Sequence, residues 1–149
     1  MNHKMDHPAP PSLVAQIGAL YHKMYKECGK IFREQGFPLE MDQVPVLMNL
    51  YYKGGSSQKD IVTDLARDKA SINRTISVLL KMDLVKVIPD TVDKRKTHVE
   101  LTASGEKLAK QADTILARFD AVLSSELTEQ ERKEFDKTML KLIEIVTPR

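Results

Sequence analysis

A short polar run within residues 68–81 contains the side chains of this sequence that are best suited to recognising another molecule through hydrogen bonds. Asn73 and Arg74 stand there among apolar residues that recur every three to four positions. Asn and Arg can each make two parallel hydrogen bonds with the edge of a base in the major groove of DNA. The residue types therefore indicate recognition of double-stranded DNA, provided that the chain presents them on one face.

A helix that begins at Asp68 would present them in this way. Asp is a favoured N-cap residue because its carboxylate accepts a free backbone N–H of the first turn. Ile72, Ile76, Leu79 and Leu80 follow at spacings that place them on one helical face. At about 100° per residue, the opposite face carries Ala70, Arg74, Ser77 and Lys81, with Ser71 and Asn73 on its flanks. Such a helix buries its apolar face and leaves the polar set free to enter a groove.

Two shorter helices are expected just before it. The first covers about residues 41–53 and stops at the glycine pair 54–55. The second covers residues 58–65, where Ser57 and Asp60 resemble a capping box at its start. This second helix would support the polar helix from behind.

A hairpin is expected after the polar helix. Residues 84–88 are rich in Val and Ile, and residues 97–101 alternate, with Thr97, Val99 and Leu101 on one face. The connection is polar and turn-forming, and its tip contains Asp93, Lys94, Arg95 and Lys96. A helix pair followed by a hairpin with a basic tip predicts a winged helix-turn-helix.

These segments together resemble the MarR family of bacterial transcriptional regulators. The motif Asp93-x-Arg95-x-x-x-Val99-x-Leu101-Thr102, followed by Gly105, is similar to the wing signature of that family. Residues 57–61 and 68–74 resemble its two helix-turn-helix elements, residues 84–85 its step into the wing, and Leu39 with residues 43–47 its preceding helix. The resemblance runs without a gap over about residues 39–105 and extends more weakly over most of the chain.

Two positions depart from the family pattern, which often has glycine in the turn at position 66 and after the polar helix at position 83. This sequence has Ala66 and Asp83 instead. Asp tolerates the left-handed backbone conformation better than most residues, so Asp83 is a mild exception. Ala66 indicates a slightly different turn.

Long helices are expected at both ends of the chain. Ser12 is a plausible N-cap for the first, whose apolar stripe is wider than a small wing domain needs. Thr102 would cap a second, and Thr128 with Glu131 forms a capping box for the last. The resemblance implies that these helices of two subunits interdigitate, so that a homodimer presents two polar helices to a palindrome.

The expected fold is therefore mainly α with a small β-hairpin wing, of the α+β class. Residues 1–11 are assigned to a mobile tail, residues 12–36 and 103–149 to a helical dimerisation region, and residues 37–102 to the DNA-binding winged helix-turn-helix domain. The residues expected to contact DNA are Ser57, Gln58, Lys69, Ala70, Ser71, Asn73, Arg74, Ser77, Lys81, Asp93, Lys94, Arg95 and Lys96.

A second group of residues is a candidate site for a small aromatic effector. Aromatic and soft side chains gather near the junction of the first two helices, at Tyr21, Tyr25, Met48, Tyr51 and Tyr52. In proteins similar to the MarR family, such effectors bind between the dimerisation and DNA-binding regions and release a repressor. The alternative is that these residues belong to the core.

Composition sets limits on the other functions. The chain has 149 residues, 42% of them hydrophobic and 30% charged, as expected for a globular domain without a membrane span. The net charge is only +2, but between residues 67 and 100 eight Lys and Arg residues stand with five Asp and Glu residues. The local positive excess, and not the overall charge, would attract DNA.

Three rival interpretations remain open at this point. An enzyme is not expected, because the sequence lacks the nucleophile motif G-x-S-x-G, a phosphate-binding glycine loop and the zinc motif H-E-x-x-H. No catalytic residue, metal ligand set or cofactor is expected.

A winged helix that binds only proteins is an alternative, and so is a thiol-based redox sensor that acts through Cys28. The single cysteine and the absence of a signal-peptide pattern predict a cytoplasmic location.

Overall fold

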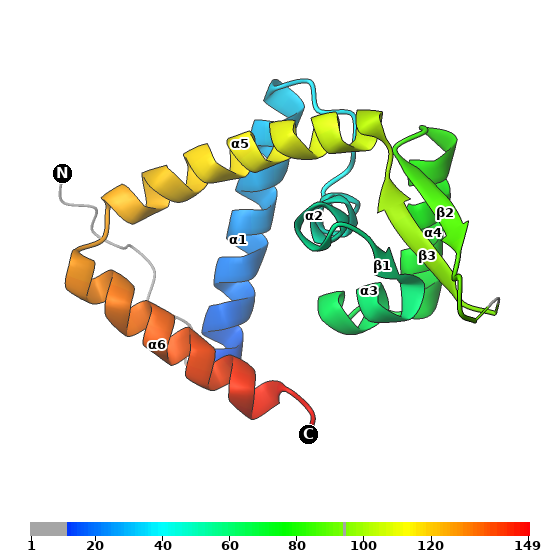
Figure 1. Cartoon of the computed structure of the whole chain (residues 1–149). Helices are drawn as coiled ribbons and strands as arrows, with labels where there is room; N and C mark the ends of the chain where they lie inside the picture. The colour runs from blue at the N-terminus through cyan, green and yellow to red at the C-terminus, as the bar shows by residue number, and fades with distance from the viewer. Residues whose placement is uncertain (1–11, 94) are drawn as a thin grey trace. The chain divides into compact units, whose positions relative to one another are not determined.

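The computed structural model describes residues 12–93 and 95–149. Within them the elements are α1 (Leu13–Glu34), α2 (Val44–Lys53), β1 (Ser56–Ser57), α3 (Gln58–Leu65), α4 (Lys69–Lys81), β2 (Val85–Pro89), β3 (Thr97–Leu101), α5 (Ala103–Ser125) and α6 (Glu129–Val146) (Figure 1). The chain forms two compact units, the first ending at Asp113 and the second running from Thr114 to Arg149. The expected mainly helical fold with a small antiparallel sheet is confirmed.

The core of the first unit is made by α2, α3, α4 and the sheet. Leu47 of α2, Ile61 of α3 and Ile72 of α4 are fully buried, and Val99 of β3 is nearly so. These residues come from the apolar faces expected of the helices and the strand. Their burial fixes α3 behind α4, which leaves the opposite face of α4 toward the surroundings.

The sheet has three strands in the order β1-β3-β2, one more than the expected hairpin. β2 and β3 are antiparallel with Val87 opposite Val99, and β1 adds Ser56 opposite the same Val99. A two-residue strand has no periodicity of its own. Only its pairing with β3 makes it a strand, so the sequence pattern could not reveal it.

Two details of the helices differ from expectation. The helix before β1 begins at Val44, after a turn, and not near Met41. In α4, Leu80 was placed on the buried face but is 42% exposed, whereas Thr75 is buried. The buried stripe therefore runs through Ile72, Thr75 and Ile76 to Leu79. It follows the i, i+3, i+4 and i+7 positions, and the i+8 position lies outside it.

Both departures from the family pattern have left-handed backbone. Asp83 has φ 55° and Ala66, at the end of α3, has φ 49°. Ala66 thus adopts the conformation that glycine favours. Because this conformation costs a residue with a side chain about 1–2 kcal/mol, Ala66 stores strain at this position.

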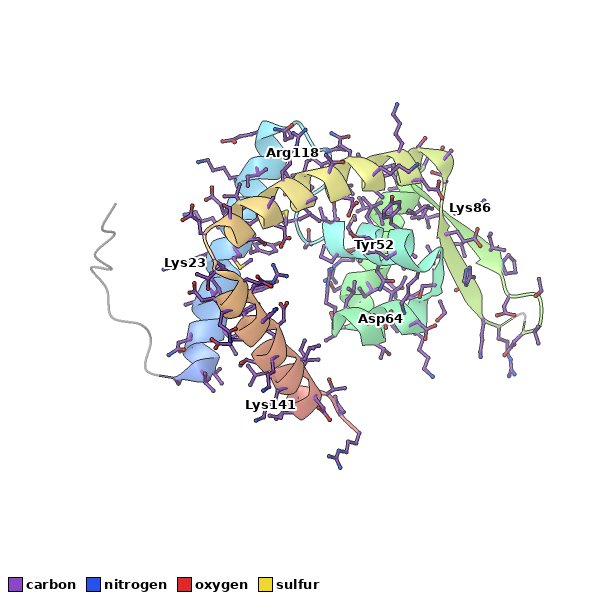
Figure 2. All side chains as sticks on the ribbon, turned by 60° about the vertical axis from the view of Figure 1, so that its left-hand side comes forward. Lys23, Tyr52, Asp64, Lys86, Arg118 and Lys141 are labelled. Carbon is purple, nitrogen blue, oxygen red and sulfur yellow. The ribbon has the colours of Figure 1, made fainter. Side chains whose placement is uncertain are left out.

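The expected caps of the long helices are present. The Ser12 side chain accepts the N–H of Ala15 at the start of α1, and Thr128 with Glu131 forms the full capping box of α6. Figure 2 shows the side chains along both helices, with Lys23 labelled on α1 and Lys141 on α6. None of the α6 residues is buried, and large apolar residues on both helices are exposed: Leu13, Val14, Ile17, Leu20, Phe135, Leu140, Ile143, Ile145 and Val146.

Candidate nucleic-acid interface

The outer face of α4 carries the polar side chains that the sequence placed there. The Asp68 carboxylate accepts the N–H of Ser71, at 3.2 and 3.3 Å from its two oxygens, and so caps the helix. On this face Lys69, Ala70, Asn73, Arg74, Ser77 and Lys81 are exposed. Ser71 is half-buried. Apart from Ser71, the helix presents its predicted contact set to the surroundings.

Arg67 fixes the start of α4 to the segment before α2. Its Nε and Nη2 atoms donate to Ser71 Oγ at 3.2 and 2.6 Å, and its Nη1 donates to the carbonyl oxygen of Asp42 at 2.5 Å. A planar guanidinium can satisfy these acceptors together because its donors form a rigid fork. Arg67 therefore holds Ser71, four residues away, and joins it to Asp42, 25 residues away. The contact with Asp42 has no local signal in the sequence.

Gln58 and Asn73 form a second link across the helix-turn-helix. The Gln58 amide nitrogen, at the first position of α3, donates a hydrogen bond to Asn73 Oδ1 on α4. Both residues were expected to contact DNA. The structure brings them together, which the sequence did not indicate.

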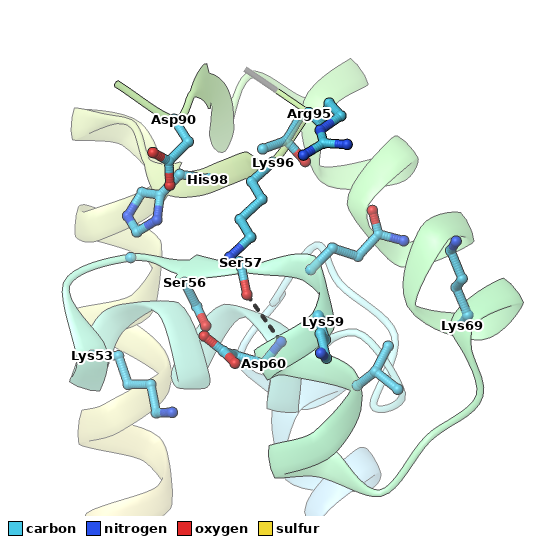
Figure 3. A pocket seen from close by; sticks show the side chains of 14 residues that line it. Lys53, Ser56, Ser57, Lys59, Asp60, Lys69, Asp90, Arg95, Lys96 and His98 are labelled. Carbon is cyan, nitrogen blue, oxygen red and sulfur yellow. Dashed lines mark hydrogen bonds between the residues drawn. The ribbon is translucent and has the colours of Figure 1, made fainter. Parts of the chain in front are cut away.

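A basic groove lies between α3, the start of α4 and the wing strand β3. It encloses a cavity of about 910 Å³, whose charged lining residues are Lys53, Lys59, Asp60, Lys69, Asp90, Arg95 and Lys96. Figure 3 shows Lys96 extending from the wing toward Ser57, with Lys59 and Lys69 on the α3 and α4 side. Positive side chains outnumber the carboxylates, so the groove suits an anionic chain such as a phosphate backbone.

Lys53 and Lys59 were not among the expected contacts. Lys53 is paired with Asp64, an interaction that reduces its availability to an anion. Lys59 is exposed in the first turn of α3, where backbone N–H groups also favour phosphate. Its place in the first turn after the Ser57 N-cap was a usable signal in the sequence.

The wing turn is built on two aspartates. Asp90 Oδ1 accepts the N–H groups of Val92 at 2.8 Å and of Asp93 at 3.1 Å. Asp93 Oδ1 in turn accepts the backbone N–H of Arg95 at 3.0 Å and its Nε at 3.3 Å. The Arg95 side chain is 92% exposed. Lys94, another expected contact, lies outside the described residues.

The two N–H donors also set the titration of Asp90. Hydrogen bonds from Val92 and Asp93 stabilise its carboxylate, and they lower the pKa of Asp90 below its usual value of 3.8. Lys96 and His98 add smaller contributions in the same direction. The turn that carries Arg95 is thus tied to an ionised Asp90.

Four of the five candidate effector residues form two neighbouring pairs, and the fifth is buried. Tyr21 and Tyr25 are neighbours on α1 with ring centroids 5.9 Å apart, and Tyr51 and Tyr52 are neighbours on α2 at 5.5 Å. Met48 is buried, which agrees with the alternative interpretation that it belongs to the core. The Tyr52 hydroxyl donates to Asp113, and this bond is the largest cause of its raised pKa.

Tyr25 borders a smaller cavity of about 390 Å³. The other residues that line it are Lys26, Gly29, Arg33, Glu40, Met41 and Asp42. Burial first and the Asp42 charge second raise the pKa of Tyr25, so the phenol stays protonated at neutral pH. The same segment contains the Asp42 carbonyl that accepts from Arg67. This cavity wall is therefore joined to α4 by one side chain.

Cys28 lies half-buried on α1. Burial and the neighbouring Glu27 raise the pKa of its thiol, which disfavours the reactive thiolate. Its surroundings thus do not favour a redox role. Within residues 12–93 and 95–149, no group of three or more His, Cys, Asp or Glu side chains could hold a metal ion, and no helix is long and apolar enough to cross a membrane.

Comparison with known proteins agrees with this geometry. Residues 39–97, from before α2 to the start of β3, match the sequence profile of the MarR family. The chain belongs to the MarR family. The matched residues form most of the winged helix-turn-helix, from the segment before α2 to the start of β3.

Individual relatives extend the match over most of the chain. The HTH-type transcriptional repressor NicR of Pseudomonas putida is 34% identical over 101 residues, which cover 66% of this chain but only 64% of NicR. The HTH-type transcriptional regulator BilQ of Clostridium symbiosum is 25% identical over 130 residues, or 85% of this chain and 90% of BilQ.

Solved structures of other proteins share the fold. A MarR transcriptional regulator from Methanosarcina mazei Go1 has a TM-score of 0.76 and 27% identity, with 86% of this chain and 91% of that one covered. MepR of S. aureus in complex with DNA has a TM-score of 0.81 and 23% identity, with 91% and 98% covered. The second likeness shows the fold alone.

Proposed function

We propose that this MarR family regulator is a cytoplasmic homodimer that binds a palindromic double-stranded operator and represses transcription until a small effector releases it. The observation that carries the proposal is the joint exposure of Asn73 and Arg74 on α4 and of Arg95 on the wing. In this arrangement α4 enters a major groove, where Asn and Arg read base edges, and Arg95 enters the adjacent minor groove.

The basic groove supports a role for α3 and β3 in holding the phosphate backbone between these two contacts. Ser57, Gln58 and Lys59 begin α3, where free N–H groups and a positive helix end favour phosphate oxygens. Lys96 approaches the same place from the wing (Figure 3). Such contacts fix the register of the protein on DNA, whereas base contacts give the sequence preference.

Dimerisation is proposed for residues 12–36 and 103–149, and DNA binding for residues 37–102. The exposed apolar residues of α1 and α6 support this division, because a monomer would leave them in water. An obligate interface of this kind buries roughly 2,000 Å² or more. Twofold symmetry then sets the spacing of two α4 helices against two half-sites.

Effector release is proposed to act through the spacing of the α4 helices. Tyr25 supports a site at the smaller cavity, and Arg67 supplies a contact from its wall to Ser71 on α4. A ligand must bind one conformation better than the other to shift the equilibrium. Titration with phenolic compounds should loosen DNA binding, and Tyr25→Ala should weaken that response. An effector response that Tyr25→Ala and Tyr52→Ala leave unchanged would exclude the tyrosine site.

The rival functions have less support. A winged helix that binds only proteins needs neither the exposed Asn73 and Arg74 pair nor a basic groove with Arg95 at its edge. A catalytic role is not indicated by any of the sequence motifs considered above. The thiol surroundings described for Cys28 do not favour redox sensing.

The proposal is tested by a DNA shift assay with the promoter region of the gene that encodes the protein. We expect a salt-sensitive, sequence-selective shift with wild type and a loss of selectivity with Arg74→Ala. Lys23→Ala is the matched control, because it removes an exposed charge from α1, away from the DNA-binding residues. Equal affinity of wild type for operator and random DNA would refute the proposal.

The dimer is tested separately by sedimentation. Ile17→Glu places a charge among the exposed apolar residues of α1 and should lower dimer formation and DNA affinity together. Lys23→Ala should change neither. A folded wild-type monomer at micromolar concentration would contradict an obligate dimer.

A further inference from the structure

We infer that Gln58 is a positioning residue that decides which hydrogen-bonding edge Asn73 presents to a DNA base. The inference rests on the proposed DNA binding and adds a determinant of its specificity. Its basis is the hydrogen bond from Gln58 Nε2 to Asn73 Oδ1, which joins the first residue of α3 to the exposed face of α4.

The backbone on the Gln58 side of this bond is held firmly. Gln58 follows Ser57, which pairs with His98 in the sheet and whose hydroxyl accepts the N–H of Asp60. One strand contact and one helix cap therefore fix the backbone from which the Gln58 side chain extends. Gln58 itself is half-buried, whereas its neighbour Lys59 is exposed.

The backbone on the Asn73 side is held equally well. Ile72, the preceding residue, is fully buried, and the Asp68 cap fixes the first turn of α4. Ile61 of α3 is also fully buried, and α3 packs against α4. The two amides thus extend from elements that share one core, and their separation does not depend on mobile chain.

The chemistry of the amide makes this contact directional. A primary amide has two N–H donors on nitrogen and two lone pairs on oxygen, and rotation about its last torsion is otherwise soft. With Gln58 as donor, the Asn73 oxygen faces Gln58 and keeps one lone pair, while both Asn73 N–H groups remain free. If Asn73 alone were rotated by half a turn, two NH₂ groups would face each other.

The edge that remains on Asn73 has an acceptor beside a donor. Adenine presents the complementary pair in the major groove, with its N6 amino group as donor and N7 as acceptor. Gln58 therefore prepares Asn73 for adenine and lowers the entropy cost of ordering the amide on binding. The chemical class of the ligand group is an adenine edge within a duplex.

A double-mutant cycle on the full-length protein tests the coupling. The measured quantity is the ratio of affinities for the operator and for operators with each adenine replaced in turn. One replaced adenine should give the largest ratio in wild type. Asn73→Ala should lower this ratio about tenfold, the usual size for one bidentate base contact. Gln58→Ala should lower the same ratio about threefold in wild type and leave it unchanged in the Asn73→Ala background.

Gln58→Glu separates positioning from simple contact. A carboxylate only accepts hydrogen bonds, so it should attract the Asn73 amino group and turn the amide over. The adenine preference should then fall at least as far as with Gln58→Ala. Its added negative charge weakens all DNA alike and cancels in the ratio. Thr63→Glu, at an exposed position of the same helix α3 and outside the expected contact set, is the charge control and should keep the wild-type ratio.

The outcomes are distinct. A lower ratio of operator affinity to altered-operator affinity in both Gln58 variants, with unchanged thermal unfolding, supports the inference. Additive effects of Gln58→Ala and Asn73→Ala overturn it, and so does a wild-type ratio in Gln58→Glu. If wild type does not prefer any operator over random DNA, the proposed function is refuted instead, because the affinity ratio is then already one before any substitution.

Discussion

The carbonyl oxygen of Leu84 occupies the space that a side chain at Gly105 would need. A Cβ atom on Gly105 would lie 2.0 Å from this oxygen, which also accepts the N–H of Thr102 at 3.0 Å. The Thr102 hydroxyl donates to the Asp83 carbonyl at 2.6 Å and accepts the N–H of Gly105 at 3.1 Å. The first turn of α5 is thus fixed to the turn that leads into the wing.

Gly105→Ala should therefore destabilise the fold. The added methyl group meets backbone, which cannot rotate away, so we expect a loss of roughly 2–4 kcal/mol in the free energy of unfolding. Ser104→Ala, at the exposed neighbouring position, should change it by less than about 0.5 kcal/mol. Urea denaturation measures both. Equal stability of the two variants would mean that α5 does not approach Leu84 so closely.

Local signals in the sequence were enough to predict most of the elements. Asp68 and Thr128 were expected as helix caps, and residues 58–65 and 97–101 were expected as a helix and a strand with the observed bounds. Each of these depends on residues within one or two turns of each other. The glycine at 105 was visible as part of a family motif, but its reason, contact with Leu84, is 21 residues away and needed the structure.

The turn between α3 and α4 offers a stabilising substitution. Ala66 has φ 49°, and the left-handed conformation costs a residue with a side chain about 1–2 kcal/mol. Glycine avoids this strain but loses more chain entropy on folding, so Ala66→Gly should add about 0.5–1 kcal/mol to stability. Ala117→Gly, within α5, should instead lose about 1 kcal/mol. Thermal unfolding that moves both variants in the same direction would contradict the assigned strain.

The contacts within the candidate site were less predictable than its outline. The exposed face of α4 followed from helical periodicity, but neither the Gln58 bond to Asn73 nor the Arg67 bond to Asp42 has a local signal. The partners are 15 and 25 residues apart, and packing of α3 and α2 against α4 brings them together. Likewise, Thr75 is buried in place of Leu80 because the core selects the stripe that faces α3.

Arg67 should affect DNA binding without touching DNA. Arg67→Lys keeps the positive charge but loses the fork that reaches Ser71 and the Asp42 carbonyl together. We expect operator affinity to fall by about threefold to tenfold, with a stability loss of about 1–2 kcal/mol from the lost hydrogen bonds. Fluorescence anisotropy and urea denaturation measure the two effects. Arg118→Lys, at an exposed position of α5, is the control and should retain wild-type affinity.

The wing turn should depend on pH through Asp90. Its pKa is lowered in the folded turn because Val92 and Asp93 donate to the carboxylate. The contribution to turn stability is therefore complete above the usual pKa of 3.8 and is lost as pH falls through the lower pKa of the folded state. Asp90→Asn keeps an oxygen acceptor but cannot titrate.

Amide chemical shifts of Val92 and Asp93 measure this dependence. In wild type both shifts should move toward unfolded values only below the usual aspartate range, whereas in Asp90→Asn the Val92 shift should stay constant with pH. A wild-type midpoint at or above 3.8 would show that the two N–H bonds do not stabilise the carboxylate.

Arg95→Ala should weaken binding to specific and random DNA by similar factors. Arg95 is exposed and held by Asp93 through an ion pair worth only about 0–1 kcal/mol to the fold, so its use is to keep a permanent charge in a ready position. A narrow minor groove attracts such a charge but distinguishes A·T from G·C poorly. Affinity measured against salt should therefore show a slope shallower by roughly one counterion. Asp93→Ala should lower DNA affinity less than Arg95→Ala, because the Arg95 charge remains and only its positioning is lost. If Arg95→Ala keeps wild-type affinity and an unchanged salt slope, the wing is not part of the interface.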